Sequence, residues 1–283
     1  MKKPFTRLKI PANLPVYLLL IIIVLPFIFP FYWMISSSGK TITEIFQFPP
    51  TFFPKVWQWE NYSRIFEFQP FLRQYFNSIY ITVTVTVCVL IVSSFSGYAF
   101  AKIRFYGKNW IFLLMLTGLM MPVEVTIIPN FILMQKLNLI NTHIPLLIIP
   151  VFGSAGIIGM FIMRQFFLSF PSELIDAAKI DGLSTFGIFF KIALPLSKSA
   201  LSTVAILTFL KVWNSYLEPL IYINDKKLFT LPLALPSFVD NMGGPVYEVQ
   251  LAATTLSVLP VLIFLFIAQQ TIVESFAQSG IKG

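Results

Sequence analysis

Long apolar runs separated by short polar segments dominate the pattern of this chain. Six runs reach the roughly 20 residues that a helix needs to cross a bilayer. They are Leu14–Ser36, Asn77–Ala101, Trp110–Ile128, Ile144–Phe166, Ser199–Ile221 and Leu251–Ile272. Within the second run, Thr82–Val87 alternates threonine and valine as a strand would. We expect it to continue the helix, because an open sheet edge in lipid leaves backbone groups unsatisfied. The pattern therefore predicts an all-α, polytopic membrane protein with six transmembrane helices.

The composition agrees with a membrane protein. Of the 283 residues, 57% are hydrophobic and only 11% are charged, whereas soluble domains carry about 25% charged residues. The net charge is +8, but the basic residues are scattered, while a nucleic-acid binder gathers them on one face; we expect no nucleic-acid partner. The single cysteine, Cys88, can form no intrachain disulfide. The single histidine, His143, has no cysteine or acidic neighbour at metal-ligand spacing, so no metal site is predicted.

Lysine and arginine in the loops predict the orientation, because they are enriched in short cytoplasmic loops. With the N-terminus inside, twelve of them fall in the inner segments: Lys2, Lys3, Arg7, Lys9, Lys102, Arg104, Lys108, Arg164, Lys179, Lys191, Lys198 and Lys282. Seven fall in the longer outer segments: Lys40, Lys55, Arg64, Arg73, Lys136, Lys226 and Lys227. Both termini are therefore expected in the cytoplasm.

The predicted organisation is a short cytoplasmic leader followed by one membrane domain. The leader covers residues 1–13 and the transmembrane domain covers residues 14–283. The first apolar run is too long for a signal peptide and lacks a small-residue cleavage site, so it is expected to be retained. The outer loops are residues 37–76, 129–143 and 222–250.

The cytoplasmic loop at residues 171–197 interrupts the apolar pattern with two short, half-polar helices. Ser172 as N-cap and Glu173 in the first turn predict the start of the first helix. Gly182 is expected to end it, because glycine adopts the left-handed conformation readily. Ser184 can cap the second helix, whose aromatic residues at i, i+3 and i+4 are expected to form one face. These residues are Phe186, Phe189 and Phe190.

The same loop carries a spaced motif: an acidic residue, two alanines, a glycine after three more residues, an isoleucine after nine more, and Leu-Pro. Its members are Asp176, Ala177, Ala178, Gly182, Ile192, Leu194 and Pro195. The motif resembles the EAA loop of permease subunits of binding-protein-dependent ABC importers, in which the first residue is usually glutamate. Further stretches are similar to carbohydrate importers of the MalG-like subgroup: Met121–Pro150, Trp213–Leu235 and Gly280–Gly283.

The resemblance implies a type I ABC importer permease that passes a sugar or oligosaccharide inward across the bacterial cytoplasmic (inner) membrane. In that family the helix–glycine–helix loop is the coupling loop, which docks in a cleft on the ATP-binding subunit. The implied partners are a second homologous permease, a dimer of ATP-binding subunits, an extracytoplasmic solute-binding protein and membrane lipid. ATP and magnesium would bind the ATPase, and this chain would hold no cofactor and no catalytic residue.

Ionisable residues inside apolar runs are candidate functional residues, because charge is costly in lipid. In the fifth run Lys211, Asn214 and Glu218 follow i, i+3 and i+7, which predicts one polar stripe on one helix face. Lys211 would lie about 18 Å from Ser199, near mid-membrane. The further candidates for the substrate path are an acid in the third run and two aromatic residues that could stack on a sugar: Glu124, Trp213 and Tyr216. The alternative is that Lys211 and an acid form a buried ion pair, within this chain or with the partner permease.

The last outer loop carries a strong turn signal at Gly243-Gly244-Pro245. In the resembling family a loop at this place reaches into the sugar cleft of the binding protein. The expected contact residues are Val239, Asp240, Asn241, Gly243, Gly244 and Tyr247. The alternative is an ordinary surface turn.

Small residues spaced by four in the second and fourth runs predict close helix packing. They are Ser93 with Gly97, and Ala155 with Gly159. Two other classes of protein compete with the importer hypothesis. A self-contained secondary transporter or channel would show internal repeats or more spans, and no repeat is visible. A membrane-embedded enzyme would need clustered histidine or acidic residues within the apolar runs, and the chain has one histidine.

Overall fold

The structure is a computed structural model that describes residues 14–240 and 242–280. These residues form helices joined by turns, and no β-strand occurs among them; a single bridge joins Val239 and Pro245. The all-α prediction is therefore confirmed. The predicted leader, residues 1–13, lies outside the described residues, as do Asn241 and the C-terminal residues 281–283. The chain divides into two compact units, residues up to 67 with 238–256, and residues 68–237 with those from 257 onward.

The first unit begins with α1, Leu14–Ser38, whose outward apolar side chains such as Phe27 (72% exposed) suit a lipid environment. Two short helices follow, α2 at Ile42–Ile45 and α3 at Glu60–Phe68, and the unit takes the first turns of α15, Tyr247–Gly280. A polar cluster holds the segment between α1 and α3. Asn61 Nδ2 donates to the carbonyl oxygens of Ser38 (2.9 Å) and Lys40 (3.0 Å).

Lys40 is the central side chain of this cluster and is fully buried. Its ammonium donates to the Thr51 carbonyl oxygen at 2.5 Å and lies 4.4 Å from the centre of the Trp33 ring. Burial lowers the pKa of Lys40, and the nearby Glu44 carboxylate opposes that shift. The carbonyl and the ring compensate part of the cost of taking the charge out of water.

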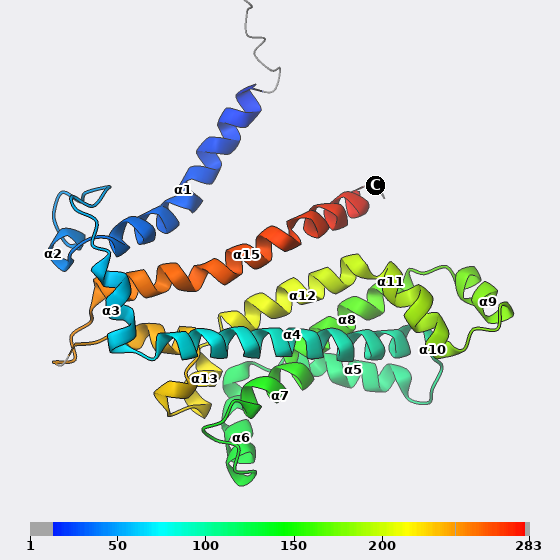
Figure 1. The fold of residues 1–283 in the computed structure, drawn as a ribbon. Helices are drawn as coiled ribbons and strands as arrows, with labels where there is room; N and C mark the ends of the chain where they lie inside the picture. The colour runs from blue at the N-terminus through cyan, green and yellow to red at the C-terminus, as the bar shows by residue number, and fades with distance from the viewer. Residues whose placement is uncertain (1–13, 241, 281–283) are drawn as a thin grey trace, which may run out of the picture. The chain divides into compact units, whose positions relative to one another are not determined.

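The second unit is built around α4, Phe71–Lys102, which packs against α7, α8 and α12 (Figure 1). The remaining helices follow in order: α5 Lys108–Leu119, α6 Val123–Lys136, α7 Ile144–Phe152, α8 Ser154–Leu168, α9 Ser172–Ile180, α10 Thr185–Ile188, α11 Leu194–Leu196, α12 Lys198–Trp213, α13 Leu217–Tyr222, α14 Leu231–Ala234 and the rest of α15. A π-helical turn covers Phe189–Ala193, and 3₁₀ turns cover Lys226–Leu228 and Leu235–Ser237. The alternating Thr82–Val87 stretch is helical, as predicted.

Four helical segments of the described residues are long and apolar enough to cross a membrane without a sharp bend: Leu19–Ser38, Phe71–Lys102, Ile144–Leu168 and Tyr247–Gln269. Two further spans are bent helix pairs. The first bends by 99° between Lys108–Gly118 and Val123–Lys136, and the second bends by 74° between Thr185–Leu196 and Lys198–Trp213. Counting each pair once gives six spans, which agrees with the predicted number.

The third and fifth spans are interrupted, whereas the predicted stripe of Lys211, Asn214 and Glu218 required a continuous helix in the fifth. In the third run the helix stops before Pro122, which has no N–H for the carbonyl of Gly118. In the fifth run α12 ends at Trp213, and α13 begins only at Leu217. Pro219 has no N–H for the carbonyl of Ser215, so a continuous helix through this point would lose a hydrogen bond and meet the proline ring.

The fourth run also breaks, at Gly153, between α7 and α8. At this break the backbone of Gly156 lies close to that of Val151. A β-carbon on Gly156 would lie 1.8 Å from the Val151 carbonyl oxygen. Only glycine fits there.

The predicted small-residue packing occurs inside this chain. A β-carbon on Gly97 of α4 would lie 2.6 Å from Cβ of Met163 on α8, and one on Gly159 would lie 2.9 Å from Cβ of Ser93. These contacts let α4 and α8 approach closely and form the centre of the second unit. The helices that surround this centre carry the residues of the candidate sites.

Candidate functional site

The elbow, residues 171–197, is the helix–glycine–helix loop, and its turn is set by Gly182. The φ angle of Gly182 is +79°. Its N–H bonds the Lys179 carbonyl oxygen and the Leu183 N–H bonds that of Ala178, both at 3.0 Å. These two bonds satisfy free carbonyls at the end of α9. A β-carbon on Gly182 would meet no atom within 4 Å, so the demand for glycine is one of backbone conformation and not of space.

The elbow's start differs from the prediction. The helix α9 begins at Ser172, and Pro171 stands in the N-cap position without a side-chain cap; assigning the cap to Ser172 was wrong by one residue. Proline holds φ at −54° here, which sets the chain direction just before the first turn. The second cap is confirmed, because Ser184 Oγ accepts a hydrogen bond from the Gly187 N–H at 3.2 Å.

The three phenylalanines of the elbow do not share one face. Phe189 is buried, with its ring 4.8 Å from that of Phe95 and 5.2 Å from that of Tyr98 on α4. Phe190 also contacts Phe95, at 5.9 Å, whereas Phe186 is 68% exposed. The α-helix changes to a π-helical turn at Phe189–Ala193, so the face expected from regular α-helical spacing does not continue from Phe186 to the other two rings. The second half of the elbow is therefore fixed to α4, while its first turn remains open.

The first helix of the elbow presents an uncovered apolar surface. Ile180 is 87% exposed and Leu174 is 40% exposed, whereas Ala178 is buried. On the same helix Asp176 and Lys179 form an exposed ion pair at 3.1 Å. Of the other motif residues, Leu194 packs against the core of the second unit. Exposed isoleucine and leucine on a nine-residue helix are typical of a surface that another protein covers.

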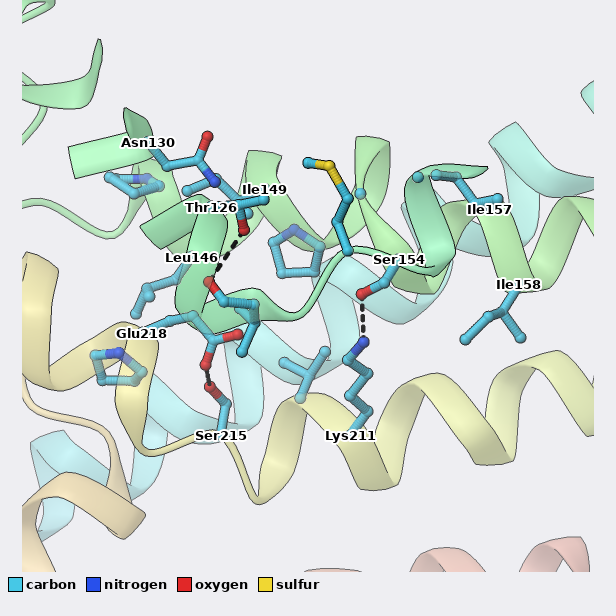
Figure 2. A pocket seen from close by; sticks show the side chains of 18 of the residues that line it. Thr126, Asn130, Leu146, Ile149, Ser154, Ile157, Ile158, Lys211, Ser215 and Glu218 are labelled. Carbon is cyan, nitrogen blue, oxygen red and sulfur yellow. Dashed lines mark hydrogen bonds between the residues drawn. The ribbon is translucent and has the colours of Figure 1, made fainter. Parts of the chain in front are cut away.

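A cavity of about 580 Å³ lies inside the second unit, and the three helix breaks meet at it (Figure 2). The bend between α5 and α6, the break between α7 and α8, and the break between α12 and α13 all contribute to its wall. The lining residues are Ile81, Gly118, Leu119, Met121, Val123, Thr126, Asn130, Pro145, Leu146, Ile149, Pro150, Gly153, Ser154, Ile157, Ile158, Lys211, Val212, Ser215, Glu218, Pro219 and Thr230. Interrupted helices at membrane depth are tolerated where they line a cavity, and they mark binding sites in other transporters.

Two opposite charges lie apart in this cavity. Lys211 Nζ donates to Ser154 Oγ, and Ser215 Oγ donates to the Glu218 carboxylate, and Figure 2 shows the two pairs at separate places on the wall. Lys211 stands in the last turn of α12 and Glu218 in the first turn of α13. Each charge is therefore stabilised by the dipole of its own helix end. Among the described residues no ion pair joins either charge to a partner.

Thr230 adds an unsatisfied hydroxyl to the wall. The residue is 6% exposed, and its Oγ1 has no hydrogen-bond partner in the structure. Thr126 and Asn130 supply further polar groups, and the other lining residues are aliphatic, methionine, proline or glycine. The cavity thus offers a few polar groups on an apolar wall, the usual composition of a small-molecule site.

The predicted stripe of Lys211, Asn214 and Glu218 on one helix was wrong, because the helix ends between its members. Asn214 terminates α12, where its Nδ2 donates to the Leu210 carbonyl oxygen at 2.8 Å, and it does not line the cavity. Lys211 and Glu218 still reach the same cavity, because the break turns the chain back toward it. Asparagine and serine favour such breaks through bonds to their own backbone.

The remaining predicted path residues lie away from this cavity. Trp213 is 5% exposed and stacks on Phe209 at 5.8 Å, so it belongs to the core. Tyr216 and Glu124 are exposed and are absent from the cavity wall. The sequence did not predict Ser154, Ser215 and Thr230, because single hydroxyls in apolar runs carry no signal until the fold brings them together.

Comparison with known proteins identifies the family. Residues 90–278 match the model of the binding-protein-dependent transport system inner membrane component. The chain belongs to this family. Of the curated relatives, the AraQ permease of an arabinooligosaccharide transport system from Halalkalibacterium halodurans is 36% identical over 90% of this chain and 91% of its own. The UgpE permease of an sn-glycerol-3-phosphate transport system from Yersinia enterocolitica is 33% identical over 93% of this chain and 95% of its own.

The permease fold is also that of a solved structure. A chain from the crystal structure of a bacterial ABC transporter involved in the import of the acidic polysaccharide alginate superposes with a TM-score of 0.79, covering 95% of this chain and 99% of that chain at 23% identity. The alternative of a self-contained secondary transporter or channel is not favoured, since members of the family depend on a binding protein.

In this permease the cavity wall continues into a tightly held segment, residues 222–231. Its backbone is bonded by side chains of α4 and by the chain between α6 and α7. Asn141 Oδ1 accepts from the N–H groups of Asn224 and Asp225, both at 3.0 Å. The other bonds are those of His143 Nε2 with Leu228 O (2.7 Å), of Gln74 Nε2 to Lys226 O (3.0 Å) and of Asn77 Nδ2 to Lys227 O and Phe229 O (3.0 Å each). Ser78 Oγ accepts from the Leu231 N–H at 2.7 Å.

Both ends of this clamped segment reach the cavity, through Pro219 just before it and Thr230 within it. The clamping side chains Gln74, Asn77 and Ser78 are buried. A segment without regular structure that is held by buried polar side chains behaves as a rigid piece of the wall, since each broken bond would leave a buried polar group unsatisfied.

The permease also carries the predicted turn in its last loop, which belongs to the first unit. Asp240 Oδ1 accepts from the N–H groups of Met242 and Gly244, both at 2.8 Å, and Gly243 has a φ of +80°. Val246 N–H bonds the Phe238 carbonyl oxygen at 3.1 Å, and Met242 is 97% exposed. The described residues on either side of position 241 are thus joined as a hairpin, and the apolar side chain of Met242 is exposed on it. Tyr247 packs against Phe46, with ring centres 5.3 Å apart.

Proposed function

We propose that this permease passes a sugar or oligosaccharide from an extracytoplasmic binding protein to the cytoplasm through the cavity at its three helix breaks. The supporting observation is the convergence of those breaks on one polar-lined cavity with Lys211 and Glu218 in its wall. Two relatives are named for the transport of arabinooligosaccharides and of sn-glycerol-3-phosphate, and the similar structure is that of a transporter involved in alginate import. These compounds are saccharides or a small hydroxylated phosphate, which supports a substrate rich in hydroxyl groups.

The transport cycle is driven from outside this chain. ATP and magnesium bind a dimer of cytoplasmic ATPase subunits, and this chain contributes no catalytic residue. A second, homologous permease completes the pathway, and the cavity of the present chain forms part of the lining. The proposal rests on membership of a binding-protein-dependent family.

The elbow is the docking element for the ATPase. Its exposed face with Leu174 and Ile180 gives the ATPase an apolar surface to cover, and Gly182 fixes the angle between the two elbow helices. Because Phe189 and Phe190 pack on Phe95 of α4, a displacement of the elbow is carried into the central helix of the second unit. The other motif residues of the elbow take part in this docking: Asp176, Ala177, Ala178, Ile192, Leu194 and Pro195.

The orientation follows from the distribution of basic residues, with both termini and the elbow in the cytoplasm. The hairpin at residues 239–247 then faces the extracytoplasmic side, where it contacts the binding protein. Its fixed backbone and exposed Met242 suit insertion into a cleft.

Uptake by the reconstituted importer tests the path. Proteoliposomes would hold this permease, its partner permease and the ATPase, with the binding protein and a labelled substrate outside. Lys211→Met and Glu218→Gln should each lower uptake at least tenfold, because a group that recognises substrate in an apolar wall is lost. The matched control is Lys136→Gln, since Lys136 is exposed at the end of α6 and does not line the cavity. Full uptake by both cavity variants would reject the cavity as the path.

A further inference from the structure

Four basic side chains converge at the turn between α4 and α5. Lys102 ends α4, Arg104 lies in the turn, Lys108 begins α5, and Arg164 comes from the neighbouring α8. We call these four residues the basic corner. It lies at the same end of the second unit as the elbow (Figure 1).

Part of the role of the basic corner is structural. Lys108 Nζ donates to the carbonyl oxygens of Ala101 (3.3 Å) and Ile103 (3.0 Å). Arg164 Nε donates to Phe100 O at 3.3 Å, and its guanidinium lies 4.0 Å from the centre of the Phe112 ring. These carbonyls lie in the last turn of α4 and just beyond it, where helix carbonyls have no partner in the helix and cations are favoured.

The carbonyl and ring contacts of the basic corner do not neutralise its positive charge. The ion pairs found among the described residues are Arg64 with Glu248 and Lys179 with Asp176, and neither involves the basic corner. Arg104 and Arg164 are close enough to Lys108 to repel its charge. Arg104 is exposed, and the other three side chains are half-buried. Four cations held together without a carboxylate favour an external anion that can accept several N–H groups at once.

The surroundings place this corner at the surface of the bilayer. Tyr106 is fully exposed and Trp110 is 78% exposed, and both lie within a few residues of Lys108. Tyrosine and tryptophan are enriched where a membrane protein meets the headgroup region, because one part of the ring system is apolar and the other can bond water. A phospholipid can cover these rings with its apolar part while its phosphate meets the cations.

We propose that the basic corner binds the phosphate headgroup of an anionic phospholipid. The guanidinium of Arg104 and the free N–H groups of Lys102 and Lys108 contact the phosphate oxygens, and the exposed rings of Tyr106 and Trp110 lie against the glycerol and upper acyl chain. Lys102 Nζ also donates to Phe170 O at 2.9 Å, directly before Pro171 and α9. The bound lipid therefore braces the base of the elbow. The inference does not depend on the substrate of the importer.

Retention of lipid by the purified importer tests the proposal. The complete complex would be titrated with dioleoyl-phosphatidylglycerol or dioleoyl-phosphatidylcholine, and bound lipid would be counted by native mass spectrometry. The wild-type complex should prefer phosphatidylglycerol. Arg104→Gln should weaken that binding about fivefold, and Arg104→Gln with Lys108→Gln roughly 25-fold, because each cation near a headgroup contributes a similar increment.

Two control variants separate charge from folding. Among the described residues no hydrogen bond or ion pair of the Arg104 side chain holds a helix, so the single variant should keep the thermal stability of the wild type. Arg104→Lys should keep the lipid preference. Lys198→Gln removes an exposed cation at the start of α12, outside the basic corner, and should leave the preference unchanged.

Three outcomes would overturn the proposal. The first is equal retention of phosphatidylglycerol by the wild type and both Gln variants. The second is an equal loss in Lys198→Gln, which would indicate a general effect of charge. The third is displacement of the lipid by 10 mM inorganic phosphate in the wild type but not by 10 mM chloride, which would identify a site for free phosphate.

Discussion

Two glycines show how differently one residue type acts at the residue scale. Gly156 is required for space, since any β-carbon would collide with the Val151 carbonyl. Gly182 is required for its backbone angle alone, since its surroundings are open. The first shapes the break beside the cavity, and the second sets the angle of the elbow.

Replacing Gly182 is therefore expected to affect coupling more than insertion into the membrane. Gly182→Val should cost about 1–2 kcal/mol for a left-handed β-branched residue, and the elbow should relieve this strain by changing its angle. Association with the ATPase, measured by copurification, should fall together with uptake, while the amount of membrane-inserted permease stays constant.

The control for Gly182 lies five residues further along the elbow. A β-carbon on Gly187 would be 3.4 Å from the Leu183 side chain, an ordinary contact, and its φ is not positive. Gly187→Ala should keep ATPase association and uptake, since alanine also favours the helix. Normal association and uptake in Gly182→Val would show that the angle of the elbow is not what the ATPase recognises.

At the scale of elements, the clamped segment at residues 222–231 depends on a few buried or conformationally unusual polar residues. Asn141 is the clearest case, because it has a positive φ of 59° and its side-chain oxygen Oδ1 accepts two backbone N–H groups. Few residues combine both properties, since the left-handed region favours asparagine, aspartate and glycine.

Removing this acceptor should loosen the segment locally. In Asn141→Ala, the amide hydrogens of Asn224 and Asp225 should exchange about 30-fold faster, because two bonds worth roughly 1 kcal/mol each are lost together. Asn141→Asp keeps both the oxygen and the tolerance for positive φ, so protection should remain. Hydrogen exchange read by mass spectrometry on the full chain measures both variants. Equal protection in Asn141→Ala and the wild type would mean that the other bonds hold the segment without it.

Element by element, the sequence predicted the positions of the spans better than their interruptions. Each of α1, α4 and α15 contains a predicted run, and α4 and α15 extend beyond it by up to eight residues. Lipid requires one long apolar helix wherever nothing interrupts it. Averaged hydropathy did not show the break after Trp213, since the polar Asn214 and Ser215 lie within a run that is apolar as a whole. Pro122 and Pro219 do signal these breaks in the sequence. Each proline lacks the N–H that would bond the carbonyl oxygen four residues earlier.

Of the two candidate sites, the elbow could be predicted from the sequence more completely than the cavity. The elbow could be predicted because capping and turn residues act on their near neighbours, as Ser184 and Gly182 do. The cavity could be predicted only in part, through Lys211 and Glu218, because charges within apolar runs stand out. Ser154, Ser215 and Thr230 come from three separate segments and become a group only when the fold assembles them.

At the scale of the whole molecule, the hairpin in the last loop connects the permease with its proposed binding protein. Deleting residues 241–244 removes the tip that Asp240 holds through the N–H groups of Met242 and Gly244. Binding-protein-stimulated ATPase activity and uptake should fall, whereas basal ATPase activity should persist because the elbow is unchanged. Met242→Gln, which keeps the backbone turn, should show a smaller loss. Full stimulation after the deletion would make the hairpin a simple connector.

The account as a whole requires that ATP binding at the elbow changes which side of the membrane reaches the cavity. Single cysteines at positions 211 and 218, in a Cys88→Ser background, would report this in the reconstituted importer, with Phe209→Cys as a control because Phe209 is buried away from the cavity wall.

The decisive measurement is the rate at which a membrane-impermeant thiol reagent modifies these cysteines from each side, with and without ATP in a hydrolysis-deficient ATPase background. The account predicts modification from the cytoplasmic side without nucleotide, modification from the outer side with ATP, and an inert Phe209→Cys in both states. Cysteines at 211 and 218 that react equally from one side in both states, or that never react, would contradict it.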